Sequence, residues 1–385
     1  MHKRTRAAIA MMTAAATLAL AACSSSTPGG GSSSSPATAA GSTTTVGFIM
    51  VGSTDDAGYN EAVSDGAKAV EKDLGTSVKV ITADQIPEND SVTQTMQAMV
   101  SQGAKIIFAT SYGYFKYALA FAKAHPDVTV LHQGGFLDGT FPANFGTYWG
   151  QAYDPVGLGG MAAGGVTQTN KLGFIYAFPI AQTIANIDAF ELGAQKLNPA
   201  AQTYVVNTSS WCDPLKQKQA VTALLDQGVD VFSQHQDCQS TVIQAVKSAG
   251  KKIVGYHYDA AALYPDGWLT GSAWNWAPIY EKIIGAVQAG TFTGGIYNAN
   301  WTGSFATGDN PLELASFGTS VSADLQAKIK AEQAALTKAG SSIFTGPIYC
   351  QDGTVLVAAG KVATYADTNS FSCLVKGVVG TLPSN

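Results

Sequence analysis

Charged side chains are scarce in this sequence. They make up 13% of its 385 residues, about half the usual share. The 27 acidic residues outnumber the 22 lysines and arginines, which gives a formal net charge of −5. A nucleic-acid-binding surface needs concentrated positive charge to neutralise phosphates, so this composition argues against a nucleic-acid partner.

Long apolar runs are equally rare, and the one that stands out covers residues 7–20. It follows three basic residues and is too short to span a bilayer as a stable helix, which is typical of an export signal. It ends in Leu-Ala-Ala-Cys at 20–23, the pattern of a bacterial lipobox. We therefore expect residues 1–22 to be a lipoprotein signal peptide and Cys23 to be lipidated. An ordinary signal peptide with an incidental cysteine is the alternative.

Neither a charge nor a large side chain occurs over residues 24–45, which consist only of Ser, Thr, Gly, Ala and Pro. Such a segment cannot bury enough apolar surface to offset its ordering entropy, so it is predicted to be disordered. As a flexible coil it would reach about 25 Å. Together with Cys23 it predicts a tether over 23–45, which holds the protein by a lipid anchor on the extracytoplasmic face of the cell membrane.

Cysteine is sparse, and four remain once Cys23 is assigned to the lipid: Cys212, Cys238, Cys350 and Cys373. An even number in an exported chain suggests two disulfides, and the absence of Cys-x-x-Cys argues against zinc. Three pairings are possible. We favour Cys212–Cys238, because each cysteine follows a predicted strand, and Cys350–Cys373, which bracket a segment that alternates like a strand pair.

Short apolar strands alternate with amphipathic helices along the rest of the chain. In the first half, strands are expected at 46–51, 78–82, 106–110 and 128–131, and helices at 61–74, 91–102 and 114–124. In the second half, strands are expected at 172–176, 204–206, 231–234 and 253–256, and helices at 182–197, 214–227 and 239–249. This order predicts an α/β fold with parallel, doubly wound sheets, which bind ligands beyond the carboxyl ends of their strands.

Polar and aromatic residues recur directly after these strands in both halves. Any one cluster could be loop decoration, but the recurrence at one type of position favours a shared cleft between two lobes. The candidate ligand-binding residues are Asp55, Tyr59, Asn60, Ser111, Tyr112, Phe178, Trp211, Asp213, Gln236, Asp259 and Trp274.

Motifs of other chemistries are missing. There is no phosphate-binding loop and no His-Glu-x-x-His, and the glycines of 157–165 do not fit a dinucleotide fingerprint, so we expect them to let a helix pack closely against its sheet. His235 and His257 follow adjacent strands, where hydrogen-bonding roles are favoured over metal ligation. We expect neither a metal nor a cofactor.

The turn Ala-Thr-Ser-Tyr-Gly at 109–113 is similar to the nucleophile elbow of hydrolases, but its first glycine is missing. A nucleophile also needs a base within hydrogen-bond reach. Asp259 and His235 could complete a triad with Ser111. We favour instead a turn that donates backbone N–H groups to a ligand, in a protein that is not an enzyme.

Several segments carry a family resemblance: VGFI at 46–49, GYN at 58–60, IFATSYGY at 107–114, NFGTY at 144–148, AFPI at 177–180, DQGVDV at 226–231, GYHYD at 255–259, WNW at 274–276 and FTGPI at 344–348. Together they resemble the basic membrane protein family of ABC-transporter substrate-binding lipoproteins, which includes purine nucleoside and nucleobase binders. The resemblance implies the type I periplasmic-binding-protein fold, in which two α/β lobes enclose the solute. Lobe 1 would comprise 46–147 and about 276–310, and lobe 2 would comprise 148–275 and about 311–385.

The resemblance also implies roles for single residues. Tyr59 stands where the family places an aromatic that stacks on the base, and Asp259 matches an acidic residue that binds ribose or a ring nitrogen. Trp211 and Asp213 match a Trp-Phe-Asp-Pro segment. Ala185 falls where many relatives have arginine, so a cationic ligand contact is missing.

The implied function is that of a monomeric solute-binding lipoprotein of an ABC importer. It would clamp a purine nucleobase or nucleoside between two lobes and deliver it to a permease in the membrane. The alternatives are a binding lipoprotein for a sugar or another small polar ring compound, and a ligand-sensing lipoprotein. An exported nucleoside hydrolase is less favoured.

Overall fold

Strand β1 (Thr44–Ile49) opens the part of the chain that the computed structural model describes, which comprises residues 43–134, 140–295, 302–303 and 311–383. These residues belong to one compact unit, Ser42–Asn385. The predicted signal peptide and Cys23 lie outside the described residues. The predicted tether extends too far, because Thr44 and Thr45 already pair with Val78 and Lys79 of the neighbouring strand.

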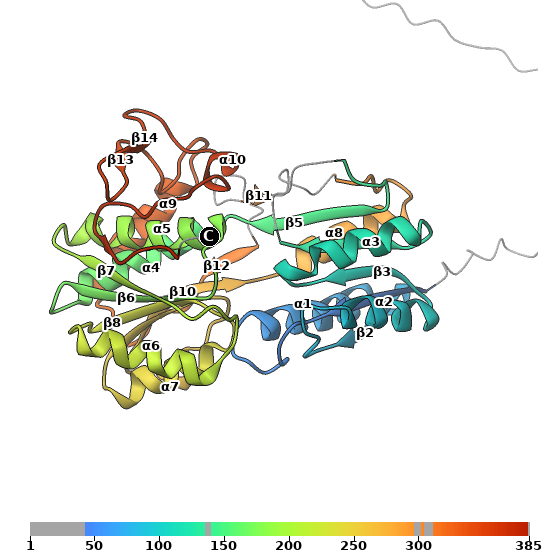
Figure 1. Cartoon of the computed structure of the whole chain (residues 1–385), viewed down its shortest axis with the longest axis horizontal. Coiled ribbons are helices and arrows are strands. Elements are labelled where there is room, and N and C mark those ends of the chain that lie inside the picture. The colour runs from blue at the N-terminus through green and yellow to red at the C-terminus, as the bar shows by residue number, and fades with distance from the viewer. Residues whose placement is uncertain (1–42, 135–139, 296–301, 304–310, 384–385) are drawn as a thin grey trace, which may run out of the picture. The chain divides into compact units, whose positions relative to one another are not determined.

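The first sheet has the order β11-β5-β4-β3-β1-β2, and all of its strands are parallel (Figure 1). Its other strands are β2 (Val78–Ala83), β3 (Ala104–Ala109), β4 (Thr129–Gln133), β5 (Phe145–Gly150) and β11 (Thr302–Gly303). Helices α1 (Tyr59–Leu74) and α8 (Ala277–Gln288) cover one face, and α2 (Ser91–Ser101) and α3 (Phe115–Ala124) cover the other.

Buried residues alternate between the two faces of this sheet, as the period of a strand requires. Phe48 and Phe108 stack at 4.8 Å on the side of α1 and α8, where Tyr280 packs against both rings. Ile49 and Ala109, one residue further along each strand, belong to the cluster formed with α2 and α3. A sheet that is covered on both faces explains why its strands are apolar almost throughout.

The second sheet has the order β12-β10-β9-β8-β6-β7-β15, with β12 antiparallel to β10. Its strands are β6 (Lys171–Tyr176), β7 (Gln202–Asn207), β8 (Val231–His235), β9 (Lys252–Gly255), β10 (Trp268–Trp274), β12 (Leu312–Leu314) and β15 (Val378–Val379). Helices α4 (Tyr153–Val166), α5 (Ala181–Leu197) and α9 (Ala323–Leu336) pack on one face, and α6 (Pro214–Asp226) and α7 (Gln239–Ser248) on the other. The predicted α/β fold with parallel sheets is confirmed.

The glycines of α4 were expected to let this helix pack against its sheet, but most of those that contact a neighbour's backbone face helix α5. A Cβ on Gly160 would lie 2.1 Å from the carbonyl oxygen of Phe190, and a Cβ on Gly193 would lie 1.9 Å from that of Gly157. Helices α4 and α5 therefore approach each other closely, backbone against backbone. Only Gly159 faces the sheet as predicted, with its Cβ position 2.6 Å from a methyl of Val254 in β9.

Two disulfides are present in the structure. Cys212–Cys238 joins the loops that follow β7 and β8, and Cys350–Cys373 closes a C-terminal segment beside β13 (Ile348–Tyr349) and β14 (Val355–Val357). These are the two pairings that the sequence favours. The prediction of a strand pair within the segment between these two cysteines, residues 353–366, is wrong. Its strand β14 pairs with β13, which precedes the segment, and the segment ends in α10 (Tyr365–Thr368).

Candidate ligand-binding cavity

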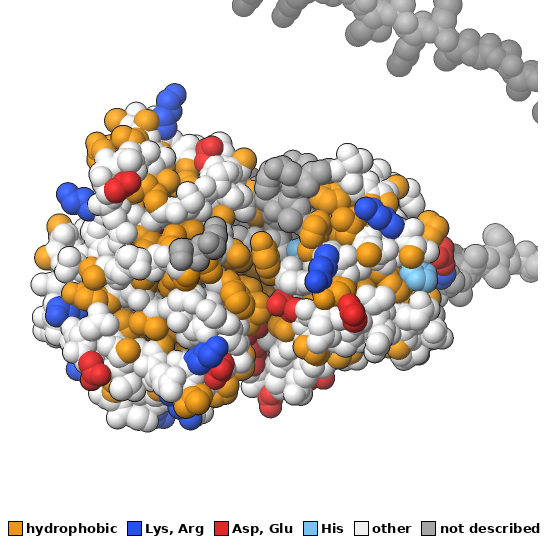
Figure 2. Space-filling model, viewed as in Figure 1, with side chains coloured by type: hydrophobic (Ala, Val, Ile, Leu, Met, Phe, Trp, Pro, Cys, Tyr) orange, Lys and Arg blue, Asp and Glu red, His pale blue; other side chains and the backbone are white. Residues whose placement is uncertain are grey.

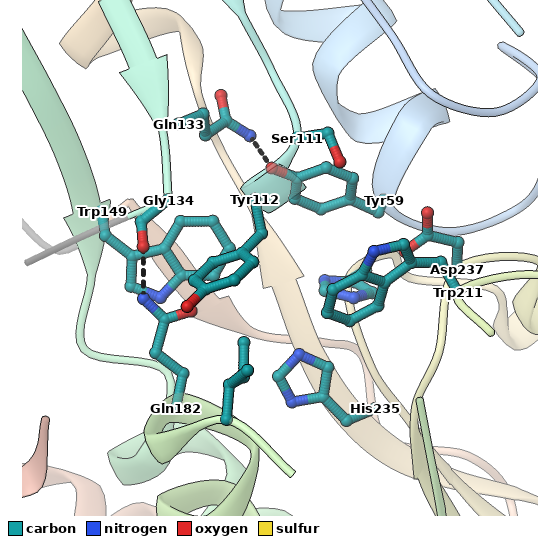
Figure 3. A pocket seen from close by; sticks show the side chains of 12 residues that line it. Tyr59, Ser111, Tyr112, Gln133, Gly134, Trp149, Gln182, Trp211, His235 and Asp237 are labelled. Atoms are coloured by element: carbon teal, nitrogen blue, oxygen red, sulfur yellow. Dashed lines mark hydrogen bonds between the residues drawn. The ribbon is translucent and has the colours of Figure 1, made fainter. Parts of the chain in front are cut away.

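A narrow cavity lies where the carboxyl ends of strands from the two sheets meet. About 350 Å³ of space lies between the atoms of this region, part of it open to solvent. Residues from both sheets and their loops line it (Figure 3): Tyr59, Ser111, Tyr112, Gln133, Gly134, Trp149, Ile180, Gln182, Trp211, His235, Asp237 and His257.

Hydrogen bonds join the loops of the first sheet to those of the second around this cavity. The Gln182 side chain donates to the carbonyl of Gly134 at 2.7 Å. Gln239 donates to the carbonyl of Ala57 at 2.7 Å. The Asn60 amide group lies 3.3 Å from the carboxyl oxygen of Asp237. The two halves are thus in direct contact, as in a closed clamp.

Aromatic rings form much of the wall. The Tyr59 ring lies 5.0 Å from that of His257 and 6.2 Å from that of Trp149, measured between centroids. On the other side, the Trp211 ring lies 6.1 Å from that of His235. In Figure 3 the side chains of Tyr59, Trp211 and His235 point toward a common space. Such an arrangement suits a flat ring that offers both of its faces.

The two histidines of the lining are neutral. Trp274 donates its indole N–H to Nδ1 of His257 at 2.7 Å, and because an indole nitrogen can only donate, His257 carries its proton on Nε2. The Asn186 amide nitrogen lies 3.1 Å from Nδ1 of His235 and fixes the same tautomer there. Burial lowers the pKa of His235 to about 3, and burial together with the neighbouring His235 lowers the pKa of His257 well below its ordinary value.

The one carboxyl group of the lining belongs to Asp237. Burial raises its pKa well above the ordinary value, and the nearby Asp56 raises it further. Asn60 lies between the two acids and donates to Asp56 at 2.9 Å and to Asp237 at 3.3 Å. Burial therefore favours the neutral form of this carboxyl group. No Lys or Arg occurs among the described lining residues, so they offer no fixed positive charge to a ligand.

Ser111 lines the cavity, and two donors of its turn are bonded to a protein group. The Ser111 hydroxyl donates to a carboxylate oxygen of Glu88 at 2.6 Å, and the backbone N–H of Gly113 donates to the same atom at 2.8 Å. The alternative triad does not form either. Asp259 is exposed, lies outside the lining, and accepts backbone N–H groups from Ala261 and Ser316.

Four of the candidate residues meet in the cavity: Tyr59, Ser111, Tyr112 and Trp211. Asp55 is exposed and bonds to Ser53. Asp213 caps helix α6 by accepting from two backbone N–H groups at 3.1 Å. Both carboxylates stabilise the local loop structure and do not line the cavity. The sequence pattern selects them because turns and helix starts use the same residue types as binding sites.

The other candidates support the lining from behind. Trp274 is buried, stacks on Trp276 at 4.1 Å and orients His257, so it does not offer a face to the ligand. Phe178 packs edge-on against Trp211 at 4.9 Å, and Gln236 donates to Thr208 at 2.7 Å. These residues, together with Asn60 and Asp259, lie outside the lining of this cavity.

Several lining residues are missing from that set. Gln133 is the last residue of β4, whose predicted end falls two residues early, and Trp149 lies in β5, which the sequence analysis does not predict. Gln182 is in the first turn of α5. His235, Asp237 and His257 lie in strand-end clusters that the sequence does indicate, and the position after a strand is the signal that could have identified them.

The comparison with protein families decides the identity. Residues 43–300 match the family described as ABC transporter substrate-binding protein PnrA-like. The chain belongs to this family. It is 31% identical over 339 residues to a purine-binding protein of Brucella abortus. The alignment covers 88% of this chain and 93% of that protein. It is 26% identical over 337 residues to a putative ABC transporter glucose-binding protein of Haloferax volcanii, covering 88% of this chain and 81% of the relative.

Solved structures agree on the fold of this substrate-binding protein. A solute-binding protein of an ABC transporter from Conexibacter woesei superposes with a TM-score of 0.60 at 20% identity, over 76% of this chain and 96% of the other. A transcriptional activator of the comK gene from Bacillus halodurans superposes with a TM-score of 0.63 at 22% identity, over 77% of this chain and 99% of the other. Membership of the family makes the protein an extracytoplasmic substrate-binding component that binds a small molecule for a permease. No helix in its described part is long and apolar enough to cross a membrane.

Proposed function

We propose that the protein binds a purine nucleobase or nucleoside in this cavity and delivers it to an ABC permease while anchored by lipid at Cys23. The observation that carries the proposal is a narrow cavity without Lys or Arg in its described lining, walled by rings from both halves of the molecule. A purine offers two apolar faces for stacking and a polar edge for a few directed hydrogen bonds. The relative named as a purine-binding protein supports the same ligand class.

The charge of the cavity argues against anionic ligands. Phosphates and dicarboxylates are held by Arg or Lys, often through bidentate contacts. The position where the family resemblance leads one to expect arginine is Ala185, which is buried in α5. On the face shown in Figure 2, basic side chains are scattered and form no broad patch that would steer an anion toward the protein. The proposal therefore requires an uncharged solute.

A sugar is the main competitor, since sugars also lie on aromatic faces and one relative is named as glucose-binding. A sugar needs many polar partners around its rim, but much of the polar lining is already used. Gln133 donates to Tyr59 at 2.6 Å and accepts from Tyr148 and Tyr280. Ser111 and Gln182 are paired with protein groups as well. The few remaining groups suit one edge of a base better.

The proposal includes no chemical step. The Ser111 hydroxyl donates to Glu88 rather than to a histidine, so the Ser–His pair of a hydrolase triad is not formed. Among the described residues, no group of three or more His, Cys, Asp or Glu side chains is arranged to hold a metal ion. We expect a nucleoside incubated with the protein to be recovered unchanged.

Isothermal titration calorimetry tests the proposal. Adenine, hypoxanthine, adenosine, guanosine and inosine are titrated beside glucose and ribose, and the recovered nucleosides are analysed by chromatography. Heat from purines and none from sugars supports the proposal. Tight binding of a sugar without heat from any purine contradicts it, and release of a free base from a nucleoside contradicts the absence of catalysis.

A further inference from the structure

The cavity lining contains two imidazole N–H donors for which no described residue supplies an acceptor. His235 and His257 are 3% and 2% exposed, and their Nδ1 atoms are occupied by Asn186 and Trp274. Each ring therefore keeps one N–H group, on Nε2, and neither Nε2 is hydrogen-bonded to a described residue. Both residues line the cavity and their ring centroids are 5.7 Å apart, a spacing that one edge of a small ligand can span. A ligand that displaces water from these N–H groups must accept from them or leave them unpaired, at a cost of about 1–3 kcal/mol each.

Acceptors are scarce in the same lining. The side-chain oxygen of Gln133 already accepts from two tyrosine hydroxyls, and the carbonyl of Gly134 accepts from Gln182. Gln182 keeps its side-chain oxygen as an acceptor, and the Asp237 carboxyl can donate as well as accept in the neutral form that burial favours. At the two imidazoles only donors are offered, and the ligand edge complementary to them is one that presents acceptors.

We propose that the cavity selects oxopurines over aminopurines, with the Nε2–H groups of His235 and His257 donating to the acceptor pair O6 and N7. This inference rests on the proposed function and names the class of purine. Guanine and hypoxanthine present two adjacent acceptors on that edge, whereas adenine presents one acceptor and an amino donor. Adenine would bring its amino group against an imidazole N–H and leave that donor unpaired.

Calorimetry with hypoxanthine and adenine tests this inference, because the two differ only at C6 and at the adjacent N1, which carries a proton in hypoxanthine and accepts in adenine. One lost buried hydrogen bond corresponds to a preference of about tenfold to a hundredfold in Kd. His257→Phe and His235→Phe each remove one donor and should reduce the ratio toward unity by weakening hypoxanthine. His125→Gln, a substitution outside the cavity lining, is the matched control and should leave the ratio unchanged.

The outcomes separate this inference from the proposed function. Equal or tighter binding of adenine by the unmodified protein would overturn the oxopurine preference, while the purine proposal would stand. An absence of heat from any purine would end both. A preference for hypoxanthine that survives in both folded His→Phe variants would show that other residues cause it. If melting curves show that a variant is unfolded, the ratio measured on the unmodified protein still decides.

Discussion

Replacing Tyr59 should reveal whether its ring stacks on the ligand. The ring lies in the cavity wall beside His257, and its hydroxyl accepts a hydrogen bond of 2.6 Å from Gln133. Stacking of a base on an aromatic side chain is worth about 1–3 kcal/mol, so Tyr59→Ala should raise the Kd for a purine about fivefold to 150-fold.

Tyr59→Ala also opens a space in a buried region, since Tyr59 is only 5% exposed. Loss of a large buried ring costs about 3–5 kcal/mol of stability, so the variant must be examined by thermal melting before it is titrated. Tyr59→Phe is the matched control. It keeps the ring and removes only the hydroxyl, so its Kd should stay within about threefold of the unmodified protein if stacking is the main contribution.

Calorimetry on both variants decides the point. The reasoning is refuted if folded Tyr59→Ala binds purine as tightly as the unmodified protein. It is equally refuted if Tyr59→Phe loses as much affinity as Tyr59→Ala, because the hydroxyl rather than the ring would then hold the ligand.

Three further predictions concern the scaffold. Gly160→Ala should destabilise the protein by about 1–3 kcal/mol, because the added Cβ would meet the backbone of α5. Gly285→Ala is the control and should be neutral or stabilising, because nothing lies within 4 Å of its Cβ position. Equal melting temperatures of the two variants would contradict this prediction. Burial lowers the pKa of His235 to about 3 from 6.5, so below pH 6.5 the unfolded chain binds a proton that the folded chain does not, and stability falls. His235→Gln should therefore lose melting temperature less steeply between pH 6.5 and 4, and an unchanged slope would count against the buried neutral imidazole. Peptide mapping without reductant should recover two linked pairs, Cys212–Cys238 and Cys350–Cys373, and recovery of either pair unlinked would contradict the structure.

Local pattern predicted most of the elements around the cavity. The α/β alternation follows from apolar runs of strand length separated by amphipathic helices, and helices α5, α6 and α7 begin and end within one residue of their predicted bounds. The sequence also predicted that residues just after the strands would line the site, because the carboxyl ends of parallel strands lie at one edge of a sheet whatever their sequence. Tyr59, Ser111, Tyr112 and Trp211 come from such positions and do line the cavity.

The direction in which each side chain points was decided only by the tertiary structure. Trp274 and Asp259 follow the strand-end pattern as well as Trp211 does, yet Trp274 is turned onto Trp276 and His257, and Asp259 bonds to a neighbouring loop. The charge state of the cavity has the same origin. Asp237 and His235 would both be ionisable in an open loop, but close packing of the two halves removes their water, which favours the neutral form of Asp237 and keeps His235 neutral. Sequence determines which groups are brought to the strand ends, and burial between the two sheets determines which of them face the ligand and which charge state is favoured.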